Sequence, residues 1–470
     1  MERDSIDFKN TDIAALFRKL LLPTVLGMIF SALFVITDGI FVGKGIGSDA
    51  LAAVNIVAPL WLFSTGIGLM FGVGASVVAS IHLSHGKVKA ARINITQSIV
   101  VSSLLLIGTS TLCSFAPQVV HLLGGSERLT PLAVEYMIWF VPFSVFTALL
   151  NSGMFFLRLD GSPNFAMMCN IVAAVLNIIL DYLFIFPFGW GMFGAAIASA
   201  IGTTVGALMI IIYLSRRKCA LRFYPVKFTR KSMQLTRRNI GYMCRLGSSA
   251  FLCEVAIACM MFVGNIVFIH YLQEEGVAAF SIACYFFPII FMVYNAIAQS
   301  AQPIISYNHG LHEETRVRRA YLLALKTAIG CGTVFALVTI FFSSEIVSMF
   351  IDRSYPAYEI ASKGLPLYAT GFIFFAVNFQ SVEQARYATI ITLLRGFVLL
   401  TACFFGLPLL FGNPGIWLAT PLAELLTTLF ILTIYIKAKR KHKKNIVSLQ
   451  HGNDDKEILP KIQTPGKKPA

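Results

Sequence analysis

Long apolar stretches separated by short polar segments dominate this sequence. A transmembrane helix needs about 20 consecutive apolar residues, and the need to satisfy backbone hydrogen bonds inside lipid excludes open sheets. Twelve stretches reach this length, so the pattern predicts an all-α membrane protein with twelve transmembrane helices. The predicted spans lie at about 14–43, 51–81, 93–118, 131–157, 164–186, 190–214, 246–270, 277–304, 320–343, 364–384, 388–411 and 414–436.

The last six stretches repeat short motifs of the first six, in the same order and at a nearly constant separation. The repeated pairs are Ala50–Ile56 with Gly276–Ile282, Ser84–Gly86 with Asn308–Gly310, and Trp190–Ala198 with Phe411–Ala419. Three ordered matches indicate an internal duplication, which predicts two pseudo-symmetric six-helix bundles. Membrane transporters often bind their substrate between two such repeats and move one repeat against the other.

The net charge of +15 is distributed unevenly between the two sides of the predicted spans. With the N-terminus placed inside, 32 of the 38 Lys and Arg residues fall in inner segments and 4 fall in outer loops. This asymmetry follows the positive-inside rule, so we expect a multi-pass protein of the cytoplasmic membrane with both termini cytoplasmic. The same placement favours attraction to anionic membrane lipid and argues against binding of nucleic acid.

The repeat and the charged segments divide the chain into four parts. We expect an N-terminal six-helix lobe at residues 1–214 and a C-terminal six-helix lobe at residues 246–436. A basic cytoplasmic linker at residues 215–245 joins the two lobes. The last segment, residues 437–470, is basic and polar, and its composition predicts a disordered cytoplasmic tail.

The composition agrees with a membrane protein and indicates no metal or redox chemistry. Hydrophobic residues make up 57% and charged residues 13% of the chain, against about 45–50% and 25% in soluble domains. The nine cysteines are scattered without a CxxC pair, and the eight histidines lie in loops or near span ends. We therefore expect no disulfide, no zinc site and no cofactor.

Acidic residues inside predicted spans need an explanation, because a charge at mid-membrane costs about 2.5–3.5 kcal/mol on insertion scales. Asp38 and Asp181 each precede the outer end of their span by about six residues, so their carboxyl groups lie at matching depth. Asn177 lies one helical turn before Asp181, on the same face of its helix. These three side chains are suited to bind a small cation such as Na⁺ or to share a proton. The alternative is a set of hydrogen-bonded packing residues.

The second half of the chain carries further charged residues within spans. Glu254, in the inner half of its span, is a candidate for binding a cationic substrate or a coupling ion. The alternative is a carboxylate that pairs with a nearby basic loop residue. Arg395 and Glu424 lie at similar depth and are predicted to form a structural ion pair. In the first half, Pro23 interrupts the hydrogen-bond ladder of its span and predicts either a hinge or a packing kink.

Six motifs together resemble those of the multidrug and toxic compound extrusion (MATE) family, over about residues 14–436. They are Thr37–Gly43, Arg158–Pro163, Asn177–Asp181, Gln302–Gly310, Leu394–Gly396 and Pro421–Glu424. The resemblance implies two lobes that form a V-shaped central cavity. It also implies export of organic cations or other amphiphiles in exchange for inward H⁺ or Na⁺.

By the same resemblance, Asp38, Asn177 and Asp181 match the family's coupling site in the first lobe, where Na⁺ or a proton would bind. Ser199 falls where the family carries a hydroxyl near that site, and Pro23 matches its bending proline. The resemblance thus implies ion-coupling residues and a hinge, and it implies no catalytic residue.

Two regions depart from the family pattern. Phe34 stands where many relatives have a tyrosine, four residues before Asp38, which removes a hydroxyl from the coupling site. Asn378 and Gln380 stand in the span where another branch of the family carries an acid. We therefore expect ion coupling in the first lobe, and we assign Glu254, Asn378 and Gln380 as candidates that line the substrate cavity.

The sequence as a whole predicts a secondary antiporter that exports amphiphilic or cationic xenobiotics by alternating access, and not an enzyme. No P-loop motif is present, so an ion gradient rather than ATP is the expected energy source. One alternative is a lipid-linked oligosaccharide flippase, which the scarcity of cationic residues within spans disfavours. Another is a membrane enzyme acting on lipid, for which no cluster of His, Asp or Ser at one interface is visible. The expected partners are small-molecule substrates and membrane lipids, with the monomer as the functional unit.

Overall fold

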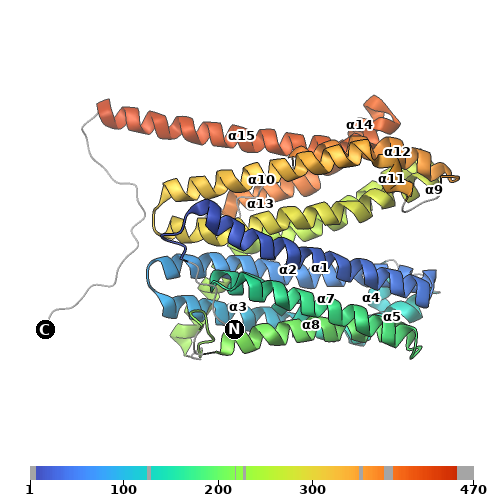
Figure 1. Cartoon of the computed structure of the whole chain (residues 1–470), viewed down its shortest axis with the longest axis horizontal. Coiled ribbons are helices and arrows are strands. Elements are labelled where there is room, and N and C mark those ends of the chain that lie inside the picture. The colour runs from blue at the N-terminus through green and yellow to red at the C-terminus, as the bar shows by residue number, and fades with distance from the viewer. Residues whose placement is uncertain are drawn as a thin grey trace. The chain divides into compact units, whose positions relative to one another are not determined.

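The computed structural model describes residues 7–123, 127, 129–216, 219–225, 229–348, 353–374 and 385–451. Within these ranges every regular element is a helix, which confirms the all-α fold class, and ten helices are long and apolar enough to cross a membrane (Figure 1). In chain order the elements are α1 (Ile13–Gly45), α2 (Ser48–Ser84), α3 (Val88–Thr109), η1 (Ser110–Phe115), α4 (Ala116–Leu122), α5 (Thr130–Phe140), η2 (Val141–Phe143), α6 (Ser144–Leu159), α7 (Pro163–Ile185), α8 (Gly191–Ser215), α9 (Arg230–Gly310), α10 (Glu314–Phe341), α11 (Ser343–Ser348), α12 (Pro356–Ala369), η3 (Thr370–Phe374), α13 (Ala385–Leu393), η5 (Leu394–Leu399), α14 (Leu400–Phe411) and α15 (Asn413–His451).

Helix α9 contains two of the predicted spans. Its 81 residues are interrupted at Gln273, whose backbone angles (φ 58°, ψ −157°) are not helical. The predicted spans 246–270 and 277–304 lie on either side of this residue. A third predicted span, 364–384, begins in α12 and η3 and continues into residues outside the described ranges.

Two boundaries differ from the sequence prediction. Helix α9 begins at Arg230, inside the segment predicted as a linker, and the Thr229 Oγ1 caps it by accepting a hydrogen bond from the Ser232 N–H at 3.3 Å. Helix α15 continues to His451, although the composition from residue 437 onward predicts disorder. Lys, Arg and Ala are good helix formers, and no Gly or Pro interrupts this stretch before Gly452, so the helix propagates beyond its apolar part.

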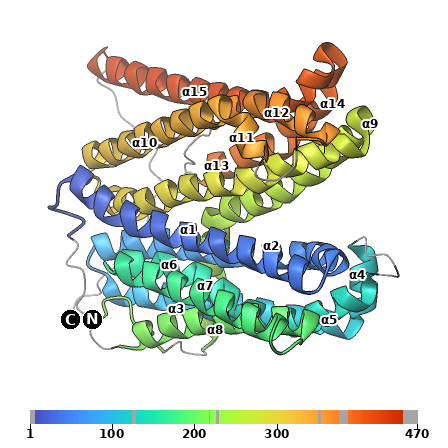
Figure 2. The same ribbon diagram turned by 45° about the vertical axis from the view of Figure 1, so that its right-hand side comes forward.

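The described residues up to Thr427 form one compact unit, and those from Thr428 onward form a second. The first unit contains two large groups of buried apolar side chains. The N-half core comprises mainly buried residues of α2, α3, α6, α7 and α8, and the C-half core comprises mainly those of α9, α10, α12 and α14. Figures 1 and 2 show α3 to α8 on one side of α1 and α2, and α10 to α14 on the other. The two cores therefore follow the two halves of the sequence repeat.

Helices α1 and α9 pack across the division between the two halves. The first turns of α1 contribute Leu16, Phe17 and Leu20 to the C-half core. Val42, near the other end of α1, packs instead with residues of α2, α5 and α8. The start of α9 conversely places Met243 in the N-half core. Each half thus holds the beginning of a helix from the other half.

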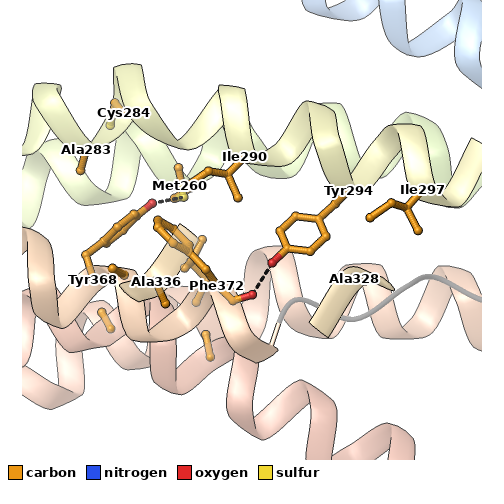
Figure 3. Packing of buried hydrophobic residues seen from close by; sticks show 14 of the residues in the cluster. Met260, Ala283, Cys284, Ile290, Tyr294, Ile297, Ala328, Ala336, Tyr368 and Phe372 are labelled. Carbon is orange, nitrogen blue, oxygen red and sulfur yellow. Dashed lines mark hydrogen bonds between the residues drawn. The ribbon is translucent and has the colours of Figure 1, made fainter. Parts of the chain in front are cut away.

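Buried tyrosines hold the C-half core together (Figure 3). Tyr294 of α9 donates its hydroxyl hydrogen to the Phe372 carbonyl oxygen, and the Tyr368 hydroxyl lies 3.7 Å from the Met260 sulfur. A buried phenol needs such a partner, because an unsatisfied hydroxyl costs about 1–3 kcal/mol. These contacts fix the two parts of α9 against η3 and α12.

Candidate functional site

A cluster of buried polar side chains lies where α1, α7 and α8 meet. Helix α1 supplies Asp38, α7 supplies Asn177 and Asp181, and α8 supplies Ser199. Asn177 and Asp181 are one turn apart, so α7 presents both on one face. Gly202 lets α8 approach that face closely, because a Cβ at this position would lie 2.7 Å from a backbone oxygen of α7. The structure therefore brings together the four residues predicted to couple an ion.

A chain of hydrogen bonds links the three helices. The Asn177 Nδ2 donates to the Ser199 Oγ at 3.2 Å, and the Ser199 Oγ donates to the Asp38 Oδ1 at 3.2 Å. Because the amide can only donate from its nitrogen, the hydroxyl proton of Ser199 is directed at the Asp38 carboxylate. Ser199 thus connects α1 to α7 through α8 at the depth of the two carboxyl groups.

Asp181 is fully buried and lies next to Asp38, close enough for the two carboxyl groups to interact directly. Asp38 and Asn177 lie beside the Asp181 carboxyl group, but no residue that the structure describes places a donor in good hydrogen-bonding geometry to either Asp181 oxygen or to the Asn177 Oδ1. A buried carboxylate that lacks both donors and a counter-ion is unfavourable by several kcal/mol. The cluster therefore gathers oxygen acceptors without a matching positive charge, which is the chemistry that suits a bound proton or a hard cation such as Na⁺.

Tyr136 of α5 is a member of this cluster that the sequence did not single out. Its buried side chain contacts the Ser199 hydroxyl and lies within electrostatic reach of Asp38 and Asp181. Phe34 offers no hydroxyl on α1, and Tyr136 provides one from a different helix. The only sequence signal for this residue is a tyrosine within an apolar span.

Glu254 lies on the face of α9 that packs against α2. Met243, Gly247 and Phe251 occupy this face at spacings of four residues, and all three lie against glycine or backbone positions of α2. Glu254 follows one turn later, and its side chain is buried. No basic side chain pairs with it in the part of the chain that the structure describes.

Arg395 and Glu424 form a partly buried ion pair in the C half. The Arg395 Nε lies 2.7 Å from the Glu424 Oε1. Arg395 belongs to η5, a π-helical turn of a kind that is frequent at functional sites. The pair lines a cavity of about 30 Å³, which is large enough for a water molecule.

Pro23 lies in α1 between the turns that pack into the C-half core and the turn that carries Asp38. Proline cannot donate a backbone hydrogen bond and crowds the preceding turn, so a helix bends most easily at such a position. A bend at Pro23 would change the position of Asp38 relative to the C half.

Comparison with known proteins identifies the family. The family model described as MatE matches the chain twice, over residues 23–183 and 250–411. The chain belongs to the MatE family. It is therefore a MATE transporter and not an enzyme, and the two matches coincide with the two halves of the sequence repeat.

Relatives of this MATE transporter cover nearly its whole length. The multidrug export protein MepA of Staphylococcus aureus (strain MRSA252) is 25% identical over 431 residues, which cover 89% of this chain and 93% of the relative. MepA of Staphylococcus saprophyticus is 24% identical and covers 89% and 92%. A MOP superfamily transporter from Pyrococcus furiosus, described by the reverse polarity of its binding pocket, superposes with a TM-score of 0.83 at 21% identity over 90% and 95% of the chains. An outward-facing multidrug resistance MATE transporter superposes with a TM-score of 0.81 at 21% identity over 92% and 98%.

The candidate residues of this MATE transporter fall into two groups in the structure. The predicted coupling residues form one cluster in the N half, extended by Tyr136. Glu254, Arg395 and Glu424 lie in the C half and take no part in that cluster. Asn378 and Gln380 lie outside the described residues.

Proposed function

We propose that this MATE transporter is a secondary antiporter that exports organic cations or amphiphilic xenobiotics in exchange for inward H⁺ or Na⁺. The observation that carries the proposal is the Asp38–Asp181 cluster, because two buried carboxyl groups lie side by side and the Asp181 oxygens have no well-placed donor among the described residues. The names of the Staphylococcus relatives, multidrug export proteins, support export of chemically varied compounds.

Helix α1 supplies the link between ion binding and movement of the two halves. Its outer part carries Asp38, and its first turns pack into the C-half core. A proton or Na⁺ that neutralises the carboxyl groups lets α1 close on α7 and α8, and its release lets α1 move away with Pro23 as the hinge. An ion drives such a change only by binding one conformation more tightly than the other. The position of α1 gives the cluster that difference in affinity.

The remaining parts of the proposal follow from charge and symmetry. Twelve spans form two lobes, residues 1–214 and 246–436, around a V-shaped cavity in which Glu254 receives the positive charge of the substrate. Both termini and the basic segments lie on the cytoplasmic side of the cytoplasmic membrane, where their Lys and Arg residues attract anionic lipid. The monomer is the unit of transport.

Everted membrane vesicles test the coupling. A fluorescent organic cation is added outside, and its uptake is followed under an imposed pH gradient, an imposed Na⁺ gradient, or neither. The unmodified protein is expected to accumulate the cation with one of the two gradients and to lose accumulation when an ionophore collapses that gradient. Asp181→Asn keeps the size of the side chain and removes its charge, so gradient-driven accumulation is expected to be lost.

The matched control is Glu135→Gln, which removes an exposed carboxylate next to Tyr136 on α5. It is expected to transport normally. Normal gradient-driven uptake by Asp181→Asn, or equal uptake by the unmodified protein with and without both gradients, contradicts the proposal.

A further inference from the structure

The contact between the two halves contains a buried guanidinium that pairs with a neutral side chain. Arg158, at the end of α6, is 2% exposed, and its Nη1 donates to the Gln299 Oε1 of α9 at 2.7 Å. No carboxylate forms an ion pair with Arg158 among the described residues, and its Nε has no hydrogen-bond partner there. A buried charge is normally balanced by an opposite charge, because its loss of hydration is otherwise uncompensated. The use of glutamine at this position therefore needs a reason.

A second polar contact lies beside it, between equivalent positions of the two repeats. The Ser76 Oγ of α2 donates to the Gln302 Oε1 at 3.3 Å, and these residues are 226 residues apart. The same separation relates Ala50 to Gly276 in the sequence repeat. Gln302 follows Gln299 by three residues and so shares its face of α9. Equivalent residues of two repeats can touch each other when they lie near the pseudo-twofold axis that relates the repeats. Ser76 and Gln302 therefore lie near that axis.

Helices α2 and α9 touch closely at positions on either side of the Ser76–Gln302 contact. A Cβ on Gly74 of α2 would lie 2.8 Å from the Met243 carbonyl carbon of α9. A Cβ on Gly310, at the end of α9, would lie 3.1 Å from Cα of Ile81 in α2. Just after the ends of α2 and α9, the ring centroids of His85 and His312 are 6.4 Å apart. This end of the molecule is closed by direct contact between the halves.

We propose that Arg158, Gln299, Ser76 and Gln302 form the cytoplasmic gate, and that the neutral Gln299 opposite Arg158 keeps the gate weak enough to open in every transport cycle. The proposal rests on the proposed function, which places this basic end in the cytoplasm. When the halves part, the Arg158 guanidinium loses its hydrogen bond to the Gln299 amide, which opposes opening. It also becomes hydrated again, which favours opening. A carboxylate at position 299 would add full charge attraction to the closed state alone. The glutamine thus holds the two states close in free energy, where one bound ion can shift their ratio.

The gate is tested by introducing Gln299→Glu into the unmodified protein and into the Arg158→Gln variant. The distance between spin labels at the exposed positions Lys87 and Glu313, on the loops that carry His85 and His312, reports the closed and open states in purified protein. Gln299→Glu is expected to lower the open fraction roughly tenfold or more and to slow transport, because it creates a buried ion pair with Arg158. Arg158→Gln is expected to raise the open fraction.

The decisive variant combines Arg158→Gln with Gln299→Glu. Its fraction of closed protein is expected to be no higher than that of Arg158→Gln alone. If Gln299→Glu closes the gate equally in both backgrounds, or has no effect with Arg158 present, the proposal is overturned. Thermal unfolding of each variant shows whether its fold is intact, so that a change in the ratio of open to closed protein is not confused with a damaged fold. The distances are measured without substrate or gradient, so a failure of the gate is distinguishable from a failure of ion coupling.

Discussion

Gly247 of α9 is the position at which the closed contact between the halves has least tolerance for added volume. A Cβ introduced by Gly247→Ala would collide with the Met70 carbonyl oxygen and would lie 2.7 Å from the Met70 carbonyl carbon, whereas ordinary contact begins at 3.4 Å. The backbones of α2 and α9 must therefore separate by at least the 0.7 Å between 3.4 and 2.7 Å. Overpacking of this kind costs about 1–3 kcal/mol.

This cost falls on the state in which α2 and α9 touch, and a state in which they have parted escapes it. At about 1.4 kcal/mol per factor of ten, the ratio of closed to open protein falls roughly 5- to 150-fold. We expect Gly247→Ala to populate the cytoplasm-open state and to slow transport, because the return to the closed state becomes limiting.

The assay is the distance distribution between labels at Lys87 and Glu313, combined with the initial rate of transport. Gly241→Ala is the matched control, since it lies on the same helix and a Cβ there meets nothing within 4 Å. Gly241→Ala stabilises the helix by about 1 kcal/mol in the closed and the open state alike, so it is expected to leave the distance distribution unchanged. An unchanged distribution in Gly247→Ala, with normal folding, would refute the idea that α2 and α9 part during transport.

Two further predictions concern the buried polar cluster of Asp38, Asn177, Asp181 and Ser199, and the start of the chain. Tyr136→Phe removes the hydroxyl that contacts Ser199 and is expected to weaken the apparent affinity for the coupling ion about two- to tenfold, measured from the ion dependence of transport; an unchanged affinity would exclude Tyr136 from the cluster. Arg316→Ala removes hydrogen bonds of 3.2 and 2.7 Å to carbonyl oxygens of residues 7–12, so this segment should be cleaved faster by protease, whereas Arg318→Ala at an exposed position should not change the cleavage rate.

The meeting of Asp38, Asn177 and Asp181 could be predicted because depth in a membrane follows directly from position along a helix. Asp38 and Asp181 precede the ends of their spans by similar numbers of residues, and Asn177 shares a face with Asp181. Tyr136 could not be predicted in the same way, because the side of α5 that faces the cluster depends on how α5 packs against α2 and α8. A pattern of apolar residues gives the depth of a side chain but not its neighbours.

The residues that form the contact between the two halves could not be predicted from the sequence either. Arg158 counts there as one more basic residue near an inner loop, which agrees with the positive-inside rule. The structure buries it against Gln299, a residue more than a hundred positions away along the chain. The exchange of α1 and α9 between the two cores is also a tertiary feature, since Leu16 and Met243 are ordinary apolar residues in their own spans.

The most direct test of ion coupling is substrate-driven ion movement in liposomes that contain only the purified protein. An outward substrate gradient is imposed without any initial ion gradient, and internal pH and Na⁺ are followed with indicators. The account predicts opposite movement of H⁺ or Na⁺ that requires both Asp38 and Asp181 and is absent in Asp38→Asn and Asp181→Asn. Substrate movement without either ion, or ion movement that persists in both variants, would contradict it.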